Sequence, residues 1–313
     1  MLVAHCLTKS FGGRHGRVRA VDGVSFALGR GETLGLVGES GCGKSTLARL
    51  ALHLIAPDHG HVDIDGQAFT TASESARRTL RRKAQIVFQD ALSSLNPRMT
   101  VGVNISEPMR LQGIGGSRDR HSAASELLEL VGLRADDAAR YPHEFSGGQC
   151  QRVAIARALV LRPDVVVFDE SVSALDVSIR AQILRLALDL QQRFGLAYLF
   201  ISHDLSVVKR MSDRIAVMYR GRIVEHGRAE AVCADPRHPY TAALIRAIPI
   251  PDPRRMRVAA LGDVATVAKA YVGGCVFRPR CPNEQADCAA APDLRGIAPD
   301  HTVACHHTEE HAA

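Results

Sequence analysis

The chain has 313 residues, of which 46% are hydrophobic and 23% charged, an ordinary composition for a globular protein and a length suited to a main domain with an appendage. No apolar run approaches the roughly 20 residues that span a bilayer, and the first residues lack the pattern of a secretory signal. The net charge of +6 accompanies only 4% aromatic residues and no tryptophan, which argues against a nucleic-acid-binding protein.

Residues 1–33 contain short strand-like runs with turn glycines, and they lead into an apolar run, Thr33–Val37, that predicts a buried strand. The next residues fit the phosphate-binding pattern G-x-x-x-x-G-K-S/T, and good helix formers follow from Leu47. This order predicts a nucleotide site, because backbone N–H groups and a helix N-terminus can both face phosphate. We expect Lys44 to reach the β- and γ-phosphates and Ser45 to hold Mg²⁺. The predicted nucleotide-binding residues here are Gly38, Glu39, Ser40, Gly41, Cys42, Gly43, Lys44, Ser45 and Thr46.

The middle of the chain is predicted to form a basic helix, then a helical segment and then a sheet. We interpret the densest basic run, residues 77–83, as a solvated helix face or a face near anionic lipid headgroups. Residues from about 90 to 160 are predicted to be mostly helical. Strand–helix alternation from Val165 to about Gly227 then predicts a parallel sheet.

Two carboxylates follow the apolar run Val165–Phe168, namely Asp169 and Glu170. Residues at the carboxyl end of a strand in an open α/β sheet contact the ligand. A buried carboxylate is unfavourable there unless it faces a cation, so Asp169 is predicted to bind the Mg²⁺ of ATP. Glu170 is placed to polarise a water against the γ-phosphate as general base. The alternative is an acidic helix cap after a core strand.

The residues Ser146, Gly147, Gly148 and Gln149 complete a pattern that resembles the ATP-binding subunits of ABC transporters. In that family this signature contacts the ATP held by the phosphate loop of the other subunit, so the resemblance implies a nucleotide-sandwich dimer. It also implies the P-loop NTPase fold of an ABC nucleotide-binding domain, an α/β fold with a mixed sheet core, an antiparallel β subdomain and a helical subdomain.

Four further assignments follow from the same resemblance. Gln89 is similar to the glutamine that contacts Mg²⁺, and His203 to the switch histidine that senses the γ-phosphate. With Glu170, these are the predicted catalytic residues. Residues 173–176 are similar to the loop that crosses the dimer interface. Phe11 is the aromatic residue expected to stack on adenine.

The sequence departs from the family pattern at three positions. Phe145 replaces the commoner leucine before the signature, Cys150 stands where arginine often follows it, and Ser171 replaces the usual proline after the glutamate. None of these changes removes a group that contacts phosphate or metal, so they affect local loop stiffness and leave the ATPase assignment intact.

Residues 94–100, 141–145 and 238–244 are similar to the oligopeptide/dipeptide/nickel branch of ABC importers. The resemblance implies an ATPase that powers import of di- or oligopeptides, with nickel or another small solute as the alternative. A soluble ABC ATPase is less favoured, because such proteins usually carry two cassettes or a long coiled-coil insertion.

The same branch implies the partners and the location of the chain. The expected partners are a related second ATPase subunit or a second copy of this chain, two transmembrane permease subunits and, indirectly, an extracytoplasmic solute-binding protein; no nucleic acid partner is expected. The chain would then lie peripherally on the cytoplasmic face of the inner membrane.

Prolines that include Pro236, Pro249 and Pro253 mark a change of composition, so we expect a nucleotide-binding domain over 1–235 and an extension over 236–313.

The extension contains four of the eight cysteines, Cys275, Cys281, Cys288 and Cys305, separated by five, six and sixteen residues. Clustered thiols in a cytosolic chain favour a metal site over disulfides, and a short proline-rich segment buries little core. Four thiolates suit Zn²⁺ or an iron–sulfur cluster, and the spacing does not choose between them.

The residues around these cysteines, 274–282 and 303–306, are similar to the C-terminal extension of the importer branch. That resemblance implies a 4Fe–4S cluster, with Zn²⁺ or no metal as alternatives.

Overall fold

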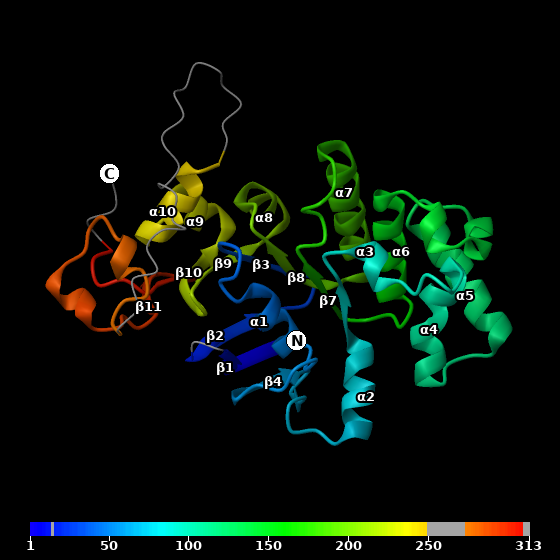
Figure 1. Cartoon of the computed structure of the whole chain (residues 1–313), viewed down its shortest axis with the longest axis horizontal. Coiled ribbons are helices and arrows are strands. Elements are labelled where there is room, and N and C mark those ends of the chain that lie inside the picture. Colours follow the sequence, from blue (N-terminus) through cyan, green and yellow to red (C-terminus); the bar gives the residue numbers. More distant parts are fainter. Residues whose placement is uncertain (14–15, 249–272, 309–313) are drawn as a thin grey trace, which may run out of the picture.

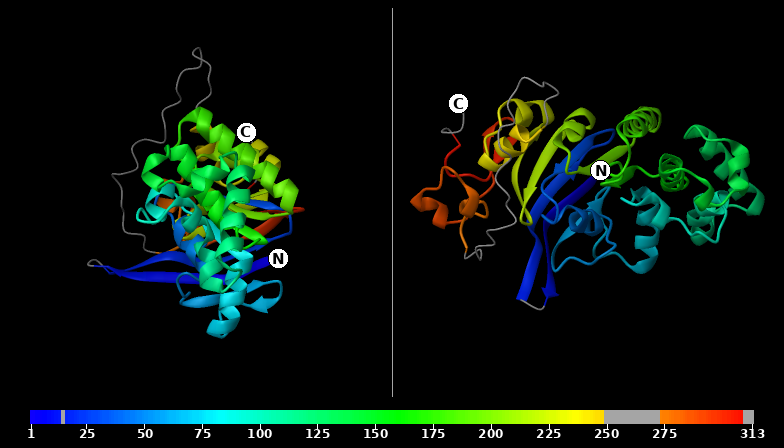
Figure 2. Two further views of the ribbon diagram at one scale, coloured as in Figure 1. Left: turned by 90° about the vertical axis from the view of Figure 1, so that its right-hand side faces the viewer. Right: turned by 45° about the horizontal axis from the view of Figure 1, so that its top comes forward.

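The structure is a computed structural model that describes residues 1–13, 16–248 and 273–308, arranged as two sheets with helices around them (Figure 1). The smaller sheet is antiparallel, with the strand order β2-β1-β4-β5. Its strands are β1 (Leu2–Gly13), β2 (Gly16–Leu28), β4 (His59–Ile64) and β5 (Gln67–Ala68). The strand-like runs of the first 33 residues thus join into a long hairpin, β1–β2, which projects from the body of the molecule (Figure 2).

The larger sheet has eight strands in the order β11-β12-β10-β9-β3-β8-β7-β6. The strands are β3 (Thr33–Val37), β6 (Ala84–Val87), β7 (Val165–Asp169), β8 (Ala197–Ser202), β9 (Arg214–Tyr219), β10 (Arg222–Arg228), β11 (Arg295–Ala298) and β12 (His301–Val303). From β6 to β9 the neighbours are parallel, as predicted.

The prediction of a parallel sheet up to Gly227 is wrong for β10, which runs antiparallel to β9. Only Arg220 and Gly221 connect the two strands, and a parallel neighbour needs a much longer crossover. Both residues have positive φ, 43° and 84°, which is the backbone of a tight two-residue hairpin turn.

The helices surround this sheet and form a separate group at one end of the molecule (Figure 1). The α-helices are α1 (Lys44–Ala51), α2 (Glu74–Lys83), α3 (Ala91–Ser94), α4 (Val101–Gln112), α5 (Ser117–Leu130), α6 (Gly147–Leu159), α7 (Val177–Phe194), α8 (Leu205–Met211), α9 (Ala229–Ala234) and α10 (Pro239–Arg246). Short 3₁₀ turns span Ala135–Ala139, Pro142–Glu144, Arg278–Arg280 and Ala286–Ala289. Helices α3 to α6 make up the helical segment predicted over residues 90–160.

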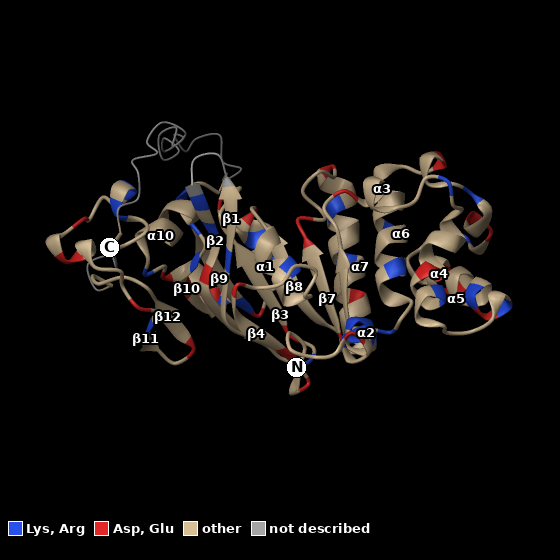
Figure 3. Cartoon of the chain, turned by 60° about the horizontal axis from the view of Figure 1, so that its bottom comes forward, with Lys and Arg blue, Asp and Glu red and all other residues tan. Residues whose placement is uncertain are grey.

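The basic run of the sequence lies on α2 (Figure 3), as predicted. Three of its cations are paired: Arg77 and Arg81 lie 3.7 Å and 2.7 Å from Glu74, and Lys83 lies 2.7 Å from Asp65. No helix among the described residues has both the length and the apolar character to cross a bilayer.

The central strands are apolar on both faces because both faces are covered. In β7, Val165 and Val167 pack into the core shared with α1 and the small sheet, whereas Val166 and Phe168 pack into the core shared with α6 to α8. All four are at most 2% exposed. Each such side chain contributes about 1.5–3 kcal/mol when fully buried, so β7 is held firmly and its carboxyl end is a rigid position for a reactive group.

The described part of the extension joins the larger sheet instead of forming a separate layer. Strand β12 pairs with β10, and β11 continues the sheet beyond it. Glu225 of β10 is fully buried, and its carboxylate accepts from the backbone N–H groups of Arg237 and His238 and lies 2.8 Å from His301 Nε2. Pro249 and Pro253, which mark the change of composition, lie outside the described residues.

Candidate active site

The phosphate loop, residues 38–46, connects the buried strand β3 to α1, as predicted. Gly43 precedes the helix with a φ of 113°, in the left-handed region that favours glycine. A Cβ at Gly43 would lie 2.1 Å from a carbonyl oxygen of β2, and one at Gly38 would lie 2.2 Å from a carbonyl oxygen of β9. Both positions therefore require glycine, which lets the loop backbone pass close to β2 and β9. The loop leads into α1, whose first N–H groups can bind an anion.

Lys44 occupies the centre of the loop and is 3% exposed. Its Nζ donates to the carbonyl oxygens of Gly38 and Glu39, at 2.8 Å and 2.9 Å, and lies 3.3 Å from Glu170 Oε1. The other oxygen of Glu170, Oε2, lies 3.4 Å from Nδ1 of His203. Residues predicted from three separate motifs therefore meet at the carboxyl ends of β3, β7 and β8.

The backbone of Glu170 has a φ of 47°, an uncommon conformation for a residue other than glycine. Its N–H donates to the carbonyl oxygen of Ile201 in β8 at 3.0 Å. A conformation of this kind costs about 1–3 kcal/mol and is often found where a side chain must be aimed at a ligand. Here it turns the carboxylate toward Lys44 and His203.

A second cluster lies beside the loop, where Ser45 Oγ donates to Asp169 Oδ1 at 2.8 Å. Asp169 is 5% exposed, and burial raises the pKa of its carboxyl, an effect opposed by the Ser45 hydrogen bond. Both residues line a cavity of about 370 Å³ together with Gln89. Hydroxyl, carboxylate and amide oxygens are the ligands that Mg²⁺ accepts, so this cavity brings together the three residues predicted to bind it.

Phe11 lies on β1 of the projecting hairpin, with 44% of its surface exposed. Lys9 Nζ lies 5.9 Å from the centroid of its ring. The ring is thus accessible, and its stacking on adenine stays a prediction.

The signature residues lie at the start of α6, away from the cavity that contains Ser45 and Asp169. Ser146 Oγ accepts from the N–H of Gln149, and Gln149 Oε1 accepts from the N–H of Ser146, so the two residues cap the helix reciprocally. Ser146 and Gly147 are exposed. A motif that is exposed and does not line this cavity of its own chain can act on another chain.

The segment that follows Glu170 is a compact turn. Ser173 Oγ donates to the carbonyl oxygen of Glu170 at 2.7 Å, while Ala174 and Asp176 are exposed. Ser171, the departure from proline, is buried, and its Oγ has no hydrogen-bond partner among the described residues. Cys150 is also buried, and its Sγ lies 3.5 Å from the carbonyl oxygen of Pro142.

Two residues of the extension, Tyr240 and Arg280, contact the phosphate loop, and neither contact could be predicted from the sequence. The hydroxyl of Tyr240 accepts from the N–H of Glu39 at 2.9 Å. The guanidinium of Arg280 donates to both carboxylate oxygens of Glu39, each at 2.9 Å. These partners are 201 and 241 residues apart in the sequence, so no local pattern could have linked them.

The four cysteines of the extension gather in one place. Cys275 and Cys288 are buried, Cys281 and Cys305 are half-buried, and the N–H of Cys275 donates to the carbonyl oxygen of Cys288 at 3.0 Å. Burial is the main cause that raises the pKa of the Cys305 thiol to about 11, and the thiols of Cys275, Cys281 and Cys288 contribute to the same rise. The sulfur atoms are therefore close enough to interact, and a cation among them would favour the thiolate forms.

The comparisons with known proteins agree with this geometry. Residues 21–173 match the family described as ABC transporter, and residues 224–288 match the oligopeptide/dipeptide transporter C-terminal region. The oligopeptide transport ATP-binding protein AppF of Bacillus subtilis is 48% identical over 297 residues, which are 93% of this chain and 90% of that protein. The chain belongs to the ABC transporter family of ATP-binding proteins. A Brucella ovis protein named as a peptide import ATP-binding protein is 49% identical to this ABC protein over 308 residues, 97% of each chain.

Among solved structures, a dimeric post-hydrolysis state of the ATP-binding cassette MJ0796 bound to ADP and Pi matches with a TM-score of 0.67. It is 29% identical and covers 73% of this chain and 99% of its own. The predicted family and the predicted ABC fold are confirmed, and the protein is an ABC-type ATPase that uses ATP with Mg²⁺. The roles of individual residues stay predictions.

Proposed function

We propose that this ABC ATPase powers the import of di- or oligopeptides. The observation that carries the solute class is the match of residues 224–288 to the oligopeptide/dipeptide transporter C-terminal region. Relatives that align with nearly the whole chain are named for peptide import or oligopeptide transport. Import of nickel or another small solute is the alternative.

The chain would act on the cytoplasmic face of the inner membrane, bound to two permease subunits that receive the solute from an extracytoplasmic binding protein. Its sandwich partner would be a related ATPase subunit, or a second copy of this chain. The exposed signature at the start of α6 supports this arrangement, because it leaves the motif free to face the phosphate loop of the partner.

Within each nucleotide site the proposed roles follow the contacts. Lys44 and the N–H groups of the phosphate loop bind the phosphates, while Ser45, Asp169 and Gln89 hold Mg²⁺. Glu170 accepts a proton from the attacking water, and His203, whose Nδ1 lies 3.4 Å from Glu170 Oε2, senses the γ-phosphate as the switch histidine.

Reconstitution tests the solute class. The chain, co-purified from its own cells with the permease and ATPase subunits that it binds, is placed in proteoliposomes with the cognate binding protein. Peptides are expected to stimulate ATP hydrolysis and to accumulate inside in an ATP-dependent manner. Stimulation by Ni²⁺ and not by peptides would favour the nickel alternative, and a chain that co-purifies with no membrane subunit would contradict transport.

We also propose that Cys275, Cys281, Cys288 and Cys305 hold a 4Fe–4S cluster. The support is that all four thiols lie together and partly buried. Among the described residues, the groups with three or more ligand atoms mutually within 4.8 Å are His5–His61–Asp63 and Asp287–Cys288–His307. No three of the four sulfur atoms are that close, whereas one tetrahedral zinc would draw four sulfurs to about 3.8 Å from one another. The wider arrangement suits a cluster better than a single zinc ion.

If the cluster is present, anaerobically purified protein should be brown and contain iron with labile sulfide. Cys281→Ser should bleach it, whereas Cys233→Ser, at a half-buried cysteine outside the group, should not. Loss of the cluster should loosen the extension and leave the nucleotide core folded, because metal binding stabilises the segment that supplies the ligands. One zinc per chain without iron would eliminate the cluster, and no metal after anaerobic purification would eliminate the site.

A further inference from the structure

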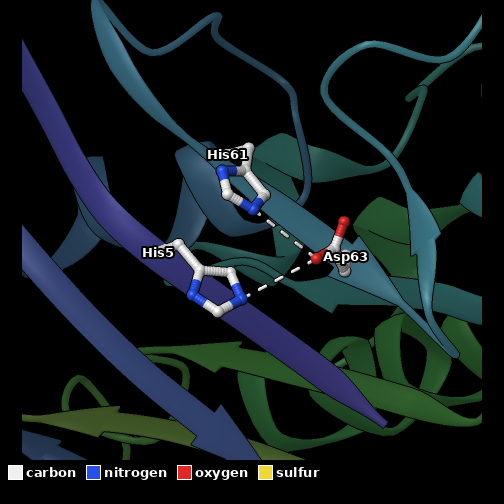
Figure 4. Close-up of side chains that lie close together, drawn as sticks. All are labelled: His5, His61 and Asp63. Atoms are coloured by element: carbon white, nitrogen blue, oxygen red, sulfur yellow. Dashed lines mark ion pairs between the residues drawn. The ribbon is translucent and has the colours of Figure 1, made fainter.

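A group of two histidines and one aspartate lies on the small sheet, apart from the active site (Figure 4). His5 of β1 and His61 of β4 are cross-strand partners, and Asp63 lies two residues beyond His61 on the same face of β4. The two rings stack with centroids 4.6 Å apart, and both Nε2 atoms point toward one oxygen of the aspartate.

The distances in this group are too long for direct hydrogen bonds. Oδ2 of Asp63 lies 3.7 Å from Nε2 of His5 and 3.6 Å from Nε2 of His61, beyond the 2.7–3.2 Å of an N–H···O bond. A metal ion bound at about 2.1 Å by each atom in a tetrahedral arrangement would separate the atoms by about 3.4 Å. The two distances to Asp63 Oδ2 thus match those around one ion within a few tenths of an ångström, and all three ligand atoms lie within 4.8 Å of one another.

We propose that His5, His61 and Asp63 form a binding site for a late first-row transition dication such as Zn²⁺, Ni²⁺ or Cu²⁺. Imidazole and carboxylate are the ligands these ions accept, whereas Mg²⁺ and Ca²⁺ prefer oxygen alone. The side chains of His5 and His61 are 48% and 50% exposed, so water can complete the coordination and the ion can exchange. The bound ion would join β1 to β4.

This site is separate from the predicted Mg²⁺ site. None of its three residues lines the cavity that contains Ser45, Gln89 and Asp169. A dication bound by His5, His61 and Asp63 would therefore not replace the Mg²⁺ of ATP.

Titration of the reduced full-length protein with Co²⁺ tests the site, because thiolate ligands give Co²⁺ a strong near-ultraviolet band that imidazole and carboxylate do not. Wild type should bind a Co²⁺ ion without this band. His61→Ala and Asp63→Asn should lose that ion or bind it at least about 100-fold more weakly, because they remove a direct ligand. His121→Ala, at an exposed histidine of α5, is the matched control and should bind as wild type.

Zn²⁺ should also raise the thermal unfolding temperature of wild type more than that of the two variants, since a ligand of the native state stabilises it. Equal binding of the band-free ion by wild type and both variants would overturn the proposal. The proposal would also be overturned if the Co²⁺ ion that the variants lose gives the thiolate band in wild type, because that ion would be bound by cysteines. Asp63→Asn keeps the shape of the side chain, so the test does not depend on a variant that disturbs the strand.

A second inference rests on the contact between Arg280 and Glu39. Arg280 is held by more than this ion pair: its side chain is 10% exposed, and its guanidinium lies 5.5 Å from the ring centroid of Tyr219 and 5.6 Å from that of Phe277. The two ring centroids are 5.3 Å apart, so the guanidinium rests against both rings, and this fixes the direction in which it meets the carboxylate. The hydroxyl of Tyr240 holds the backbone of the same loop residue.

We infer that Arg280 is a positioning residue for ATP, which it affects through Glu39 and the phosphate loop. Cys281 follows Arg280 directly in the sequence. A change in the cysteine group can therefore move Arg280, and through Arg280 the phosphate loop. The extension would thus tune nucleotide affinity. This inference rests on ATP binding at the phosphate loop, which wild type must show in the same assay.

Arg280→Ala should raise the KM for ATP roughly tenfold and leave kcat near wild type. A tenfold change is the low end of the effect of a charge-assisted hydrogen bond, and we expect the low end because Glu39 is 41% exposed. Arg280→Lys should be intermediate, since an ammonium cannot hold both oxygens. Arg278→Ala, which removes a surface ion pair with Glu284 only, is the matched control.

The double variant Arg280→Ala/Glu39→Ala should have the same KM as Glu39→Ala alone, because the arginine would act only through the glutamate. An unchanged KM in Arg280→Ala, or effects of the two changes that multiply, would overturn the inference. Arg280→Lys tests it even if the alanine variant does not fold.

Discussion

Glu170→Gln is expected to bind ATP but to lose turnover by roughly 100- to 10,000-fold, the usual contribution of a general base. The amide keeps the size of the side chain but cannot accept the proton of the attacking water. It also removes the negative charge 3.3 Å from Lys44 Nζ, so Lys44 is no less available to phosphate and ATP affinity should not fall. Steady-state hydrolysis and equilibrium ATP binding, measured on the same preparation, separate the two effects.

Glu129→Gln, at an exposed glutamate of α5, makes the same chemical change away from the site and should hydrolyse ATP as wild type. Hydrolysis by Glu170→Gln close to the wild-type rate would show that another group accepts the proton. Loss of ATP binding in a folded Glu170→Gln protein would show that the glutamate supports the phosphate loop and does not serve the chemistry.

The ATP site could be predicted from the sequence because each of its parts is local. A strand, a glycine-rich loop and a helix bring Gly38, Gly43 and Lys44 together over a few residues, and the carboxyl ends of parallel strands meet at one edge of a sheet. Once β3, β7 and β8 are recognised as such strands, the meeting of Lys44, Glu170 and His203 follows from topology. The contact distances and the positive φ of Glu170 do not follow, because they depend on how the loops pack.

The features that the sequence could not predict depend on contacts between distant segments. The hydrogen bonds of Arg280 and Tyr240 to Glu39 join the extension to the phosphate loop. The residues around Arg280 and Tyr240 form no sequence pattern that predicts these bonds. The pairing of β12 with β10 is similar, because a three-residue strand gives almost no periodic signal. The reversal at β10 is different: only two residues, Arg220 and Gly221, separate β9 from β10, a length that excludes a parallel crossover once both strands are recognised.

Ser146→Arg is expected to reduce hydrolysis by roughly 100-fold or more while the same chain still binds ATP, since the signature would stabilise the nucleotide of the partner. The structure makes this a better test than Gly148→Asp: a Cβ at Gly148 would lie 2.5 Å from Cγ2 of Ile179, so that change also disturbs the packing of α6 on α7. Ser146 is exposed, and losing its helix cap costs only about 1 kcal/mol.

Ser122→Arg, which adds the same charge to exposed α5, is the control and should keep full activity. Hydrolysis is measured in the assembled complex, and ATP binding in the isolated chain. If the signature acts across the interface, Ser146→Arg should reduce hydrolysis in the complex and leave ATP binding by the isolated chain unchanged. If a folded Ser146→Arg chain fails to bind its own ATP, the signature serves its own phosphate loop, and the sandwich arrangement is wrong for this protein.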